Sequence, residues 1–594
     1  MYNDRQSLFP NNPAMNDQSR LNKSKSILPI MDWLPKYRRE LLGGDINAGI
    51  IVTIVLIPQA MAYAMLAGLP PQIGLYSCLL PIMLYALFGS SRTLAVGPVG
   101  LVSLIVGSTI IEMGLLGQQQ ALTVAVTLAC MSGILLLLLR IFKLGSVINF
   151  ISHPVLSGFT SAAAVLIILS QLKHLLGLEI PRTIHLPEAF TNISTHLHEM
   201  NMVTAILGIS SIAIMLLLRS DWLRKLGEIK LSTRAVDIVS RTGPLIIVSS
   251  GIIIAWWLAL DQNANVNIVG VIPAGLPTLS IPSIDDIALI RELLPIAFII
   301  AIVGYLESVS VAKALATRKR QKIDADQELL AHGICNLGAS ISGGYPTAGG
   351  FGRSMVNYDS GANTPLASII TAILMSVALL FLTPLLYYLP HSVLAAIIIV
   401  AVSALIDYKA FKHAWQYDKA DALALVVTFI MVLTMGVEIG ILTGACLSIG
   451  IYLHRSSKPH VAIVGRVGDS EHFRNVDRFE VKTCQDVIAM RVDENLYFSN
   501  TNFLEDSIIN LIAENQQAKH LVIVCSSVNM IDASALEALD TIVDRLRHAG
   551  VTVHLAEVKG PVMDRLKNSP FLERLQPGQV FLSTHEAMKT LGCS

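Results

Sequence analysis

The chain has 594 residues, of which 53% are hydrophobic and only 14% are charged. An ordinary soluble domain carries about 25% charged residues, so this composition predicts a membrane protein. The formal net charge is zero and no basic tract is dense enough to follow a phosphate backbone, which argues against a nucleic-acid partner. Seven scattered cysteines without a CxxC pair predict neither a metal site nor a disulfide framework. No P-loop, HExxH or GxSxG motif points to an enzyme.

Residues 1–44 are polar, lack the apolar core of a signal peptide, and predict a mobile tail that is not cleaved. Beyond them apolar runs recur, and each is a candidate membrane-crossing helix. In chain order they occupy about 46–67, 74–88, 94–107, 121–139, 144–172, 202–218, 244–260, 293–316, 329–341, 343–361, 362–386, 393–406, 420–435 and 437–453. This pattern predicts an α-helical polytopic membrane protein with 14 spans. An odd number of spans in each half predicts two inverted repeats of seven spans.

Two of the runs are broken by glycine and proline, and each is the third of its seven. They are AVGPVGLVSLIVG, Ala95–Gly107, and GGYPTAGGFGRSMVNYDSG, Gly343–Gly361. Lipid offers no water to an opened backbone, so such breaks predict half-helices that line a cavity. Two facing half-helix N-termini would present N–H groups and partial positive charge to an anion. Gly-rich helix packing is the alternative interpretation, but packing does not call for Arg353.

Positive charge predicts the side on which each loop lies. Basic residues gather after the fourth span, between the sixth and seventh, and after the eighth: Arg140, Lys143, Arg219, Arg224, Lys225, Lys230, Arg234, Arg241, Lys313, Arg318, Lys319, Arg320 and Lys322. The intervening loops, 173–200 and 261–290, hold only Lys173 and Arg182. Basic loops stay on the cytoplasmic side, so both termini are expected in the cytoplasm.

Past Leu453 the composition becomes that of a soluble domain. Strand-like runs at 487–492, 520–525 and 551–555 alternate with helical patterns at 501–513, 534–549 and 561–567, which predicts a small α/β domain. Asp532 and Ser534 can cap the helix that begins near them. The expected domains are a cytoplasmic tail at 1–44, a membrane domain at 45–454, a linker at 455–476 and a cytoplasmic α/β domain at 477–594.

Five stretches carry longer motifs: IPQAMAYAMLAGLPP at 57–71, PPQIGLYSCLLPIMLYALFGSSR at 70–92, VGPVGLVSL at 96–104, GYLESVSVAKALA at 304–316 and GGYPTAGGFGRSMVN at 343–357. Together they resemble the sulfate permease (SulP) family of anion transporters, although Ile73 and Cys78 depart from its usual residues. The last part of the chain resembles the sulfate-transporter and anti-sigma-antagonist (STAS) domain. The resemblance extends from about Trp33 to the C-terminus.

The resemblance implies a core domain that carries the substrate and a gate domain against which the core moves. The anion would lie between the third and tenth spans, beside the first span. The implied substrate-binding residues are Gln59, Tyr63, Val99, Gly100, Gly352 and Arg353. Backbone N–H groups, an amide, a hydroxyl and a guanidinium would then replace the hydration of an oxyanion. Gly352 stands where relatives often have Ser, so this site would lose a hydroxyl contact or admit a larger anion.

Glu307 lies within an apolar span, where ionisable groups are costly and usually functional. One role is titration, with protonation accompanying anion entry in proton symport. A second role is to hold Na⁺, as a carboxylate does in sodium-coupled bicarbonate members of the family. A third is a fixed ion pair with Arg353 that only orients two helices. Members with Glu here resemble the proton-coupled branch, which favours the first role.

We therefore expect a secondary active anion transporter, a sulfate:proton symporter with elevator-type alternating access, in the bacterial inner membrane. A Na⁺-coupled bicarbonate transporter and a proton-coupled dicarboxylate transporter are the alternatives. A membrane anion sensor that signals through the STAS domain is an alternative of another class. The expected partners are the anion, the coupling ion, membrane lipid and a second copy in a homodimer. No cofactor or metal is expected.

Ser534 matches the position that is phosphorylated in anti-sigma antagonists, which makes it a candidate regulatory residue. A phosphate there would meet a helix N-terminus, but Asp532 would repel it. Helix capping explains the same serine without a kinase.

Overall fold

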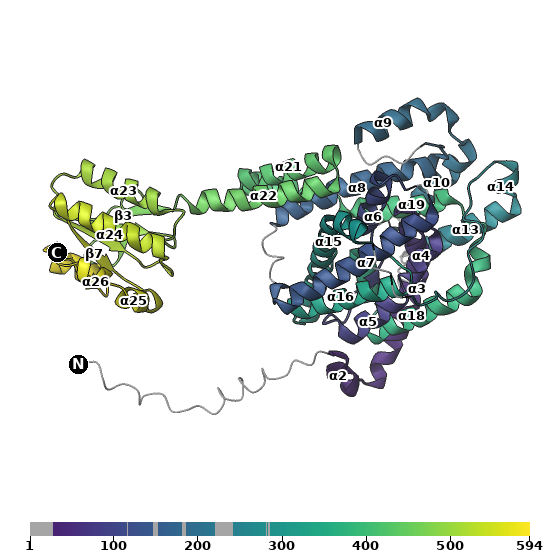
Figure 1. The fold of residues 1–594 in the computed structure, drawn as a ribbon, viewed down its shortest axis with the longest axis horizontal. Helices are drawn as coiled ribbons and strands as arrows, with labels where there is room; N and C mark the ends of the chain where they lie inside the picture. The colour runs from purple at the N-terminus through teal and green to yellow at the C-terminus, as the bar shows by residue number, and fades with distance from the viewer. Residues whose placement is uncertain are drawn as a thin grey trace, which may run out of the picture. The chain divides into compact units, whose positions relative to one another are not determined.

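Helices form the first three quarters of the chain, and an α/β sheet forms the last quarter (Figure 1). The computed structural model describes residues 28–115, 117–145, 152–180, 186–219, 242–280, 282 and 286–593. The chain divides into two compact units, one ending at Cys446 and one beginning at Leu447. The basic residues Arg224, Lys225, Lys230, Arg234 and Arg241 and the first 27 residues of the expected tail lie outside the described ranges.

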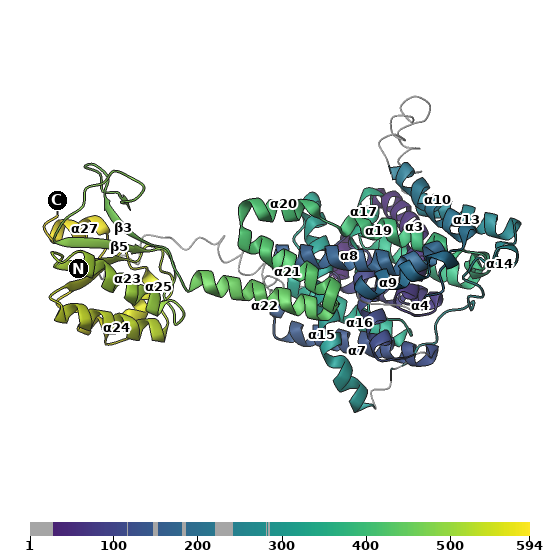
Figure 2. The same cartoon turned by 90° about the horizontal axis from the view of Figure 1, so that it is seen from above.

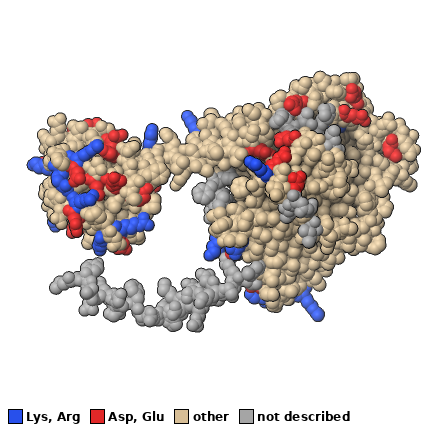
Figure 3. All heavy atoms as spheres, viewed as in Figure 1, with Lys and Arg blue, Asp and Glu red and all other residues tan. Residues whose placement is uncertain are grey.

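The helical unit follows the predicted order of spans. Each of the first seven expected spans coincides with one helix or with two consecutive elements. In order these are α3 (Leu42–Leu66); α4 (Pro71–Tyr76) followed by α5 (Leu80–Phe88); β1 (Val96–Gly97) followed by α6 (Gly100–Glu112); α7 (Gln118–Ile141); α8 (His153–Leu176); α10 (Met202–Arg219); and α13 (Gly243–Trp257). The second seven coincide with α15 (Ile287–Lys319), α16 (Ala325–Ile341), β2 (Ala348–Gly349) with α17 (Phe351–Asp359), α18 (Leu366–Val377), α19 (His391–Val402), α21 (Lys419–Met435) and α22 (Val437–Ser456). Within the described residues, 8 helices are long and apolar enough to cross a membrane. Figure 3 shows that the visible face of this unit is mostly free of charged atoms.

Shorter elements connect the spans. They are α2 (Ile30–Trp33), the 3-10 turns Leu34–Lys36 and Arg39–Leu41, α9 (Leu186–Thr195), α14 (Leu260–Asn263) and α20 (Tyr408–Tyr417). The first three fall within 1–44, which was expected to be a mobile tail. Trp33 is buried there, so burial of one aromatic side chain orders the end of that segment.

Helices pack through small residues, both between the two halves of the helical unit and within one half. Gly133 of α7 meets Gly333 of α16, where a Cβ added to Gly133 would lie 2.8 Å from the carbonyl oxygen of Gly333. Gly74 of α4 lies against α3 so closely that an added Cβ would be 1.9 Å from the Ala60 oxygen. Because lipid supplies no hydrophobic drive between helices, such close backbone contacts carry the packing.

The C-terminal unit is a sheet with helices on both faces (Figure 2). Its elements are β3 (Val461–Arg466), β4 (Phe473–Asn475), β5 (Val487–Val492), α23 (Thr501–Glu514), β6 (His520–Val524), α24 (Ala533–His548), β7 (Thr552–Ala556), α25 (Gly560–Lys567), α26 (Phe571–Arg574), β8 (Val580–Phe581) and α27 (Thr584–Thr590). The strand order is β4-β3-β5-β6-β7-β8, with β5 to β8 parallel and β3 antiparallel to both of its neighbours. The sheet begins earlier than expected, because β3 and β4 lie within 455–476, the range predicted to be a linker.

A disulfide joins Cys484 to Cys593, with their Cα atoms 6.0 Å apart. It attaches the residues that follow α27 to the chain that enters β5. The sequence predicted no disulfide framework, because 109 residues separate the two cysteines and spacing alone does not reveal pairing.

We predict that Gly74→Ala destabilises the helical unit by about 1–3 kcal/mol, because the new methyl group forces α3 and α4 apart. Gly450→Ala in α22 is the matched control, since nothing lies within 4 Å of its added Cβ. Thermal unfolding of the purified protein in detergent measures both. Equal unfolding temperatures for the two variants would contradict the close α3–α4 contact.

Acid should weaken the C-terminal unit. Burial, together with the neighbouring His520, lowers the pKa of His554 to about 4, against about 6.5 for an unfolded histidine. The unfolded chain therefore binds more protons, and the contribution of His554 to stability is complete above pH 6.5 and is lost as the pH falls toward 4. The protection factors of the β7 amides against hydrogen exchange, which correct for the slower intrinsic exchange in acid, should fall between pH 7 and pH 5. His554→Gln should flatten this change and exposed His548→Gln should not; the same loss of protection in both variants would refute it.

Candidate anion-binding site

Two very short strands join the halves of the helical unit. β1 and β2 pair antiparallel, with Val96 opposite Gly349 and Gly97 opposite Ala348. Helix α6 begins at Gly100, shortly after β1, and α17 begins at Phe351, shortly after β2. The antiparallel pairing sends the two helices away from the pair in opposite directions. Both N-termini, with N–H groups that have no partner inside their own helix, therefore lie next to the paired strands.

Arg353 joins the two half-helices. It is the third residue of α17, its side chain is 3% exposed, and its Nη1 donates a hydrogen bond of 2.6 Å to the carbonyl oxygen of Pro98. The guanidinium lies against Gly97 and Gly350, where an added Cβ at Gly350 would be 3.1 Å from Nη2. The Nε and Nη2 atoms are buried and make no hydrogen bond with the described residues. Arg353 thus offers two donors and a positive charge beside both helix ends.

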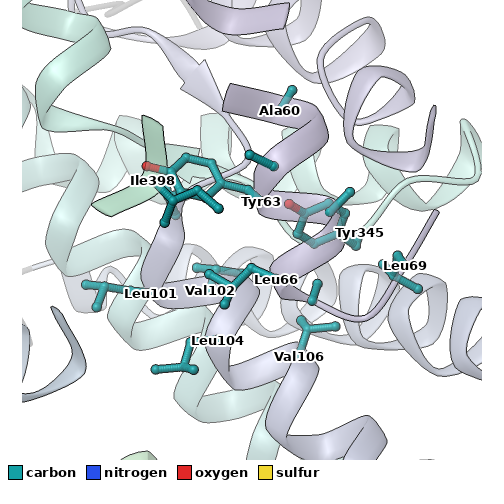
Figure 4. Packing of buried hydrophobic residues seen from close by; sticks show 14 of the residues in the cluster. Ala60, Tyr63, Leu66, Leu69, Leu101, Val102, Leu104, Val106, Tyr345 and Ile398 are labelled. Carbon is teal, nitrogen blue, oxygen red and sulfur yellow. The ribbon is translucent and has the colours of Figure 1, made fainter. Parts of the chain in front are cut away.

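Helix α3 places two polar side chains at the same point. Tyr63 is buried, and its ring lies 3.4 Å from the position of a Cβ added to Gly100. Figure 4 shows Tyr63 and Tyr345 among the apolar side chains of α3 and α6. One turn before Tyr63, the buried Oε1 of Gln59 has no hydrogen-bond partner among the described residues. The phenol therefore stands beside the α6 N-terminus, and the amide lies one turn earlier on the same face of α3.

Helix α15 supplies the fourth wall of the site. The hydroxyl of Ser308 donates to the Gly304 oxygen at 2.6 Å and accepts the N–H of Gly349 at 2.7 Å, which holds β2 against α15. The neighbouring Glu307 is partly buried, and its Oε2 has no hydrogen-bond partner among the described residues. Within the described chain, no ion pair joins Glu307 to Arg353. The structure thus does not form the fixed ion pair that was one interpretation of Glu307.

Further hydrogen bonds hold the extended segments that lead into the two half-helices. The Ser354 hydroxyl accepts the N–H of Ala95 at 2.9 Å, and the Asn357 amide donates to the Thr93 oxygen at 3.0 Å. The hydroxyls of Ser103 and Tyr345 lie 2.9 Å apart. These residues were not among those predicted from the sequence. Their only sequence signal is that Ser and Asn stand in otherwise apolar surroundings.

The remaining residues implied by the family resemblance lie at the two helix ends. Val99 caps α6 and is buried, and Gly100 is the first residue of α6. Gly352 is exposed, and nothing lies within 4 Å of its added Cβ, so the site has room beside α17. The described residues contain no group of three His, Cys, Asp or Glu side chains that could hold a metal ion. The site thus offers hydrogen-bond donors that suit an oxyanion: helix N-termini, a guanidinium, an amide and a phenol.

Ser534 lies apart from this site, in the C-terminal unit. It is exposed and is the second residue of α24. The cap of that helix is Asp532, whose carboxylate accepts the N–H of Ala535 at 2.8 Å and the N–H of Phe498 at 2.9 Å. The capping role therefore falls to Asp532.

The fold and these sites define a polytopic helical membrane protein with a C-terminal STAS domain. Residues 42–428 match the sulfate permease family and residues 478–587 match the STAS domain. The chain belongs to the sulfate permease family. It is 35% identical over 576 residues to "Probable sulfate transporter 4.2" of Arabidopsis thaliana. That alignment covers 95% of this chain and 83% of the relative. It is 30% identical over 612 residues to "High affinity sulfate transporter 1" of Stylosanthes hamata, which covers 99% and 90% of the two chains.

Solved structures show the same fold at low sequence identity. The structure of SLC26A9 matches with a TM-score of 0.86 at 23% identity and covers 98% of this chain and 94% of that one. The transmembrane domain of a cyanobacterium bicarbonate transporter, BicA, matches with a TM-score of 0.57 at 22% identity and covers 70% and 99%. These matches confirm the predicted fold class, and the family match confirms the resemblance read from the motifs.

Proposed function

We propose that the protein is a secondary active anion transporter, a sulfate:proton symporter. The main support is that two half-helix N-termini meet beside buried Arg353, whose Nε and Nη2 have no hydrogen-bond partner among the described residues. An uncompensated buried guanidinium is costly, and a bound oxyanion would satisfy both of its free donors. Sulfate is chosen as the anion because relatives that align over almost the whole chain are named sulfate transporters.

The proposed site surrounds the anion with donors from three elements. The amides around Gly100 and Gly352 supply N–H groups, Arg353 supplies charge, and Gln59 and Tyr63 supply an amide and a hydroxyl. Val99, as the α6 cap, would set the position of the first N–H groups. The open space at Gly352 would let a tetrahedral anion approach the backbone closely.

Two helix groups in contact at this site support an elevator-type movement. Helices α3 to α7 pack with α15 to α18, and α8, α10, α19 and α21 pack with one another. The α6 N-terminus lies at their boundary, since an added Cβ at Gly100 would meet Ile167 of α8 and Val402 of α19 within 3.5 Å. In the proposal the first group is the core domain and carries the anion past the second, the gate domain.

Glu307 is the proposed proton carrier. It lies one residue before Ser308, whose hydroxyl accepts the N–H of Gly349 in β2. Gain or loss of a proton on Glu307 would therefore change the charge next to the proposed anion site. A carboxylate there would repel an anion and a neutral carboxyl would not, which couples proton entry to anion entry.

The STAS domain is proposed to lie in the cytoplasm with both termini and to contact a second copy in a homodimer. The proposed membrane domain is 45–454, and the proposed STAS domain begins at 477. Strands β3 and β4 extend the sheet of the STAS domain into the segment that precedes residue 477. Ser534 is exposed enough for a kinase to reach it, and Asp532 already caps the helix.

Arg353→Ala should abolish saturable sulfate uptake by reconstituted protein, because the site loses the buried guanidinium that lies beside both helix ends. Exposed Arg318→Ala on α15 is the matched control and should keep uptake. Equal elution volumes in gel filtration establish that both variants fold. Normal uptake kinetics in Arg353→Ala would remove this residue from the site.

Glu307→Gln should imitate the protonated carboxyl. Bound sulfate would still exchange across the membrane, but accumulation driven by a proton gradient should fail. Exchange and accumulation are measured in the same liposomes with labelled sulfate, with and without an inward proton gradient. If the variant still accumulates sulfate against its gradient, the coupling group lies elsewhere in the chain.

Removal of the STAS domain should weaken the dimer and change the uptake rate. The shortened chain should end at Ser457, because a cut after β4 would remove β5, the partner of β3, and leave an exposed strand edge. Light scattering in detergent reports the oligomeric state, and liposome flux reports the rate. A stable dimer with an unchanged rate would mean that this domain is neither the contact nor the regulator.

A further inference from the structure

One face of α7 forms the wall of two adjoining cavities. The first, of about 390 Å³, lies along Gln119, Thr123 and Thr127. The second, of about 220 Å³, continues along Thr127, Cys130, Ile134 and Leu138. These positions recur at the three- and four-residue spacing of a helix, so they form one stripe. Thr127 and Pro282 line both cavities, which makes the two a single groove.

The groove changes from polar to apolar along its length. Its first part is faced by hydroxyl and amide side chains of α7 and of the segment before α15: Gln119, Thr123, Thr278 and Ser280. Its second part is walled by α7 and the start of α15, through Met131, Ile134, Leu138, Ile290 and Leu294. The N–H of Ser280 donates to the Ile341 oxygen of α16 at 2.9 Å, which fixes the polar end. Figure 2 shows α7, α15 and α16 lying together.

The position of the groove fits a single leaflet of the bilayer. With the N-terminus in the cytoplasm, the chain enters α4, α7 and α15 from the outer side and leaves α16 there. The polar cavity is lined by the outer ends of α4 and α7, by the segment that precedes α15 and by the residues that follow α16. From Thr127 to Leu138 the helix rises about 16 Å, close to the roughly 15 Å depth of half a hydrocarbon core. Ile134 and Leu138 are 41% and 45% exposed, so the apolar part opens toward lipid.

We propose that this groove binds one outer-leaflet lipid, with an acyl chain along α7 and a neutral, hydroxyl-rich headgroup in the polar cavity. Among the described residues that line either cavity, none is charged. A phosphate headgroup would lose hydration there without gaining a cation, whereas sugar hydroxyls find both donors and acceptors. The site uses the proposed orientation of the chain but none of the residues assigned to anion transport.

The test is native mass spectrometry of delipidated full-length protein with equal amounts of a galactosyl diacylglycerol, phosphatidylcholine and phosphatidylglycerol. The galactosyl lipid should give the highest occupancy. Ile134→Trp should fill the apolar groove and lower that occupancy about tenfold, as expected when about two methylene groups are excluded. Ile430→Trp on α21 is the matched control, because Ile430 is a similarly exposed isoleucine, and it should leave occupancy unchanged.

A headgroup variant separates the two halves of the groove. Gln119→Leu should keep lipid binding but reduce the preference for the galactosyl lipid over phosphatidylcholine. Equal loss of binding in Ile134→Trp and Ile430→Trp, or no loss in either, would overturn the site. Tighter binding of phosphatidylglycerol than of the galactosyl lipid would overturn the proposed headgroup chemistry.

Discussion

The pairing of β1 with β2 is the contact on which the candidate site depends. Only two residues of each strand take part, yet this pairing brings the start of α6 and the start of α17 to one place from opposite halves of the chain. Extended backbone within a membrane needs internal partners for its N–H and C=O groups. Here each strand supplies them to the other, and Ser308 accepts one more N–H. Without this pairing the half-helices would have unsatisfied ends and no fixed separation.

Arg353 makes the same place favourable for an anion. Two helix N-termini already carry partial positive charge, and a buried guanidinium adds a full one. Pro98 takes one of its donors, and the described residues supply neither a carboxylate nor another acceptor for the other buried nitrogen atoms. Proteins seldom leave such a group uncompensated, since removing a charge from water is expensive. Among the described residues, the nearby Glu307 forms no ion pair with it, which is why we propose that a charge brought from outside compensates the guanidinium.

Much of the membrane fold and of the candidate site could be predicted from the sequence, because the bilayer restricts which residues a spanning helix can contain. Apolar run lengths located the spans, and glycine with proline marked the broken ones, since ordinary spanning helices avoid both. Arg353 and Glu307 were identified because ionisable residues in apolar runs are rare. The two-residue strands could not be predicted, because their pairing joins residues about 250 positions apart and so short a strand has no periodicity. The role of Ser308 depends on the same long-range contact.

The C-terminal unit shows a similar division. Alternating strand and helix patterns predicted its α/β class, but β4 has three residues, none of them buried, and β3 contains a glycine, so their residues resembled a linker. The Cys484–Cys593 disulfide escaped prediction because it depends on how α27 returns to the sheet. Asp532 and Ser534 could both be proposed as caps from their residue types. Only the structure distinguishes them, through the bond from Ala535 to Asp532.

The most direct test of the central claim is the uptake of labelled sulfate by liposomes that contain the purified, unaltered protein. We expect saturable uptake that an inward proton gradient raises above equilibrium and that a Na⁺ gradient does not raise. Unlabelled sulfate should suppress this uptake more strongly than bicarbonate or a dicarboxylate. Absence of flux for every anion tested would contradict a transporter and favour an anion sensor. Uptake driven by Na⁺ and suppressed best by bicarbonate would contradict the proposed substrate and coupling ion.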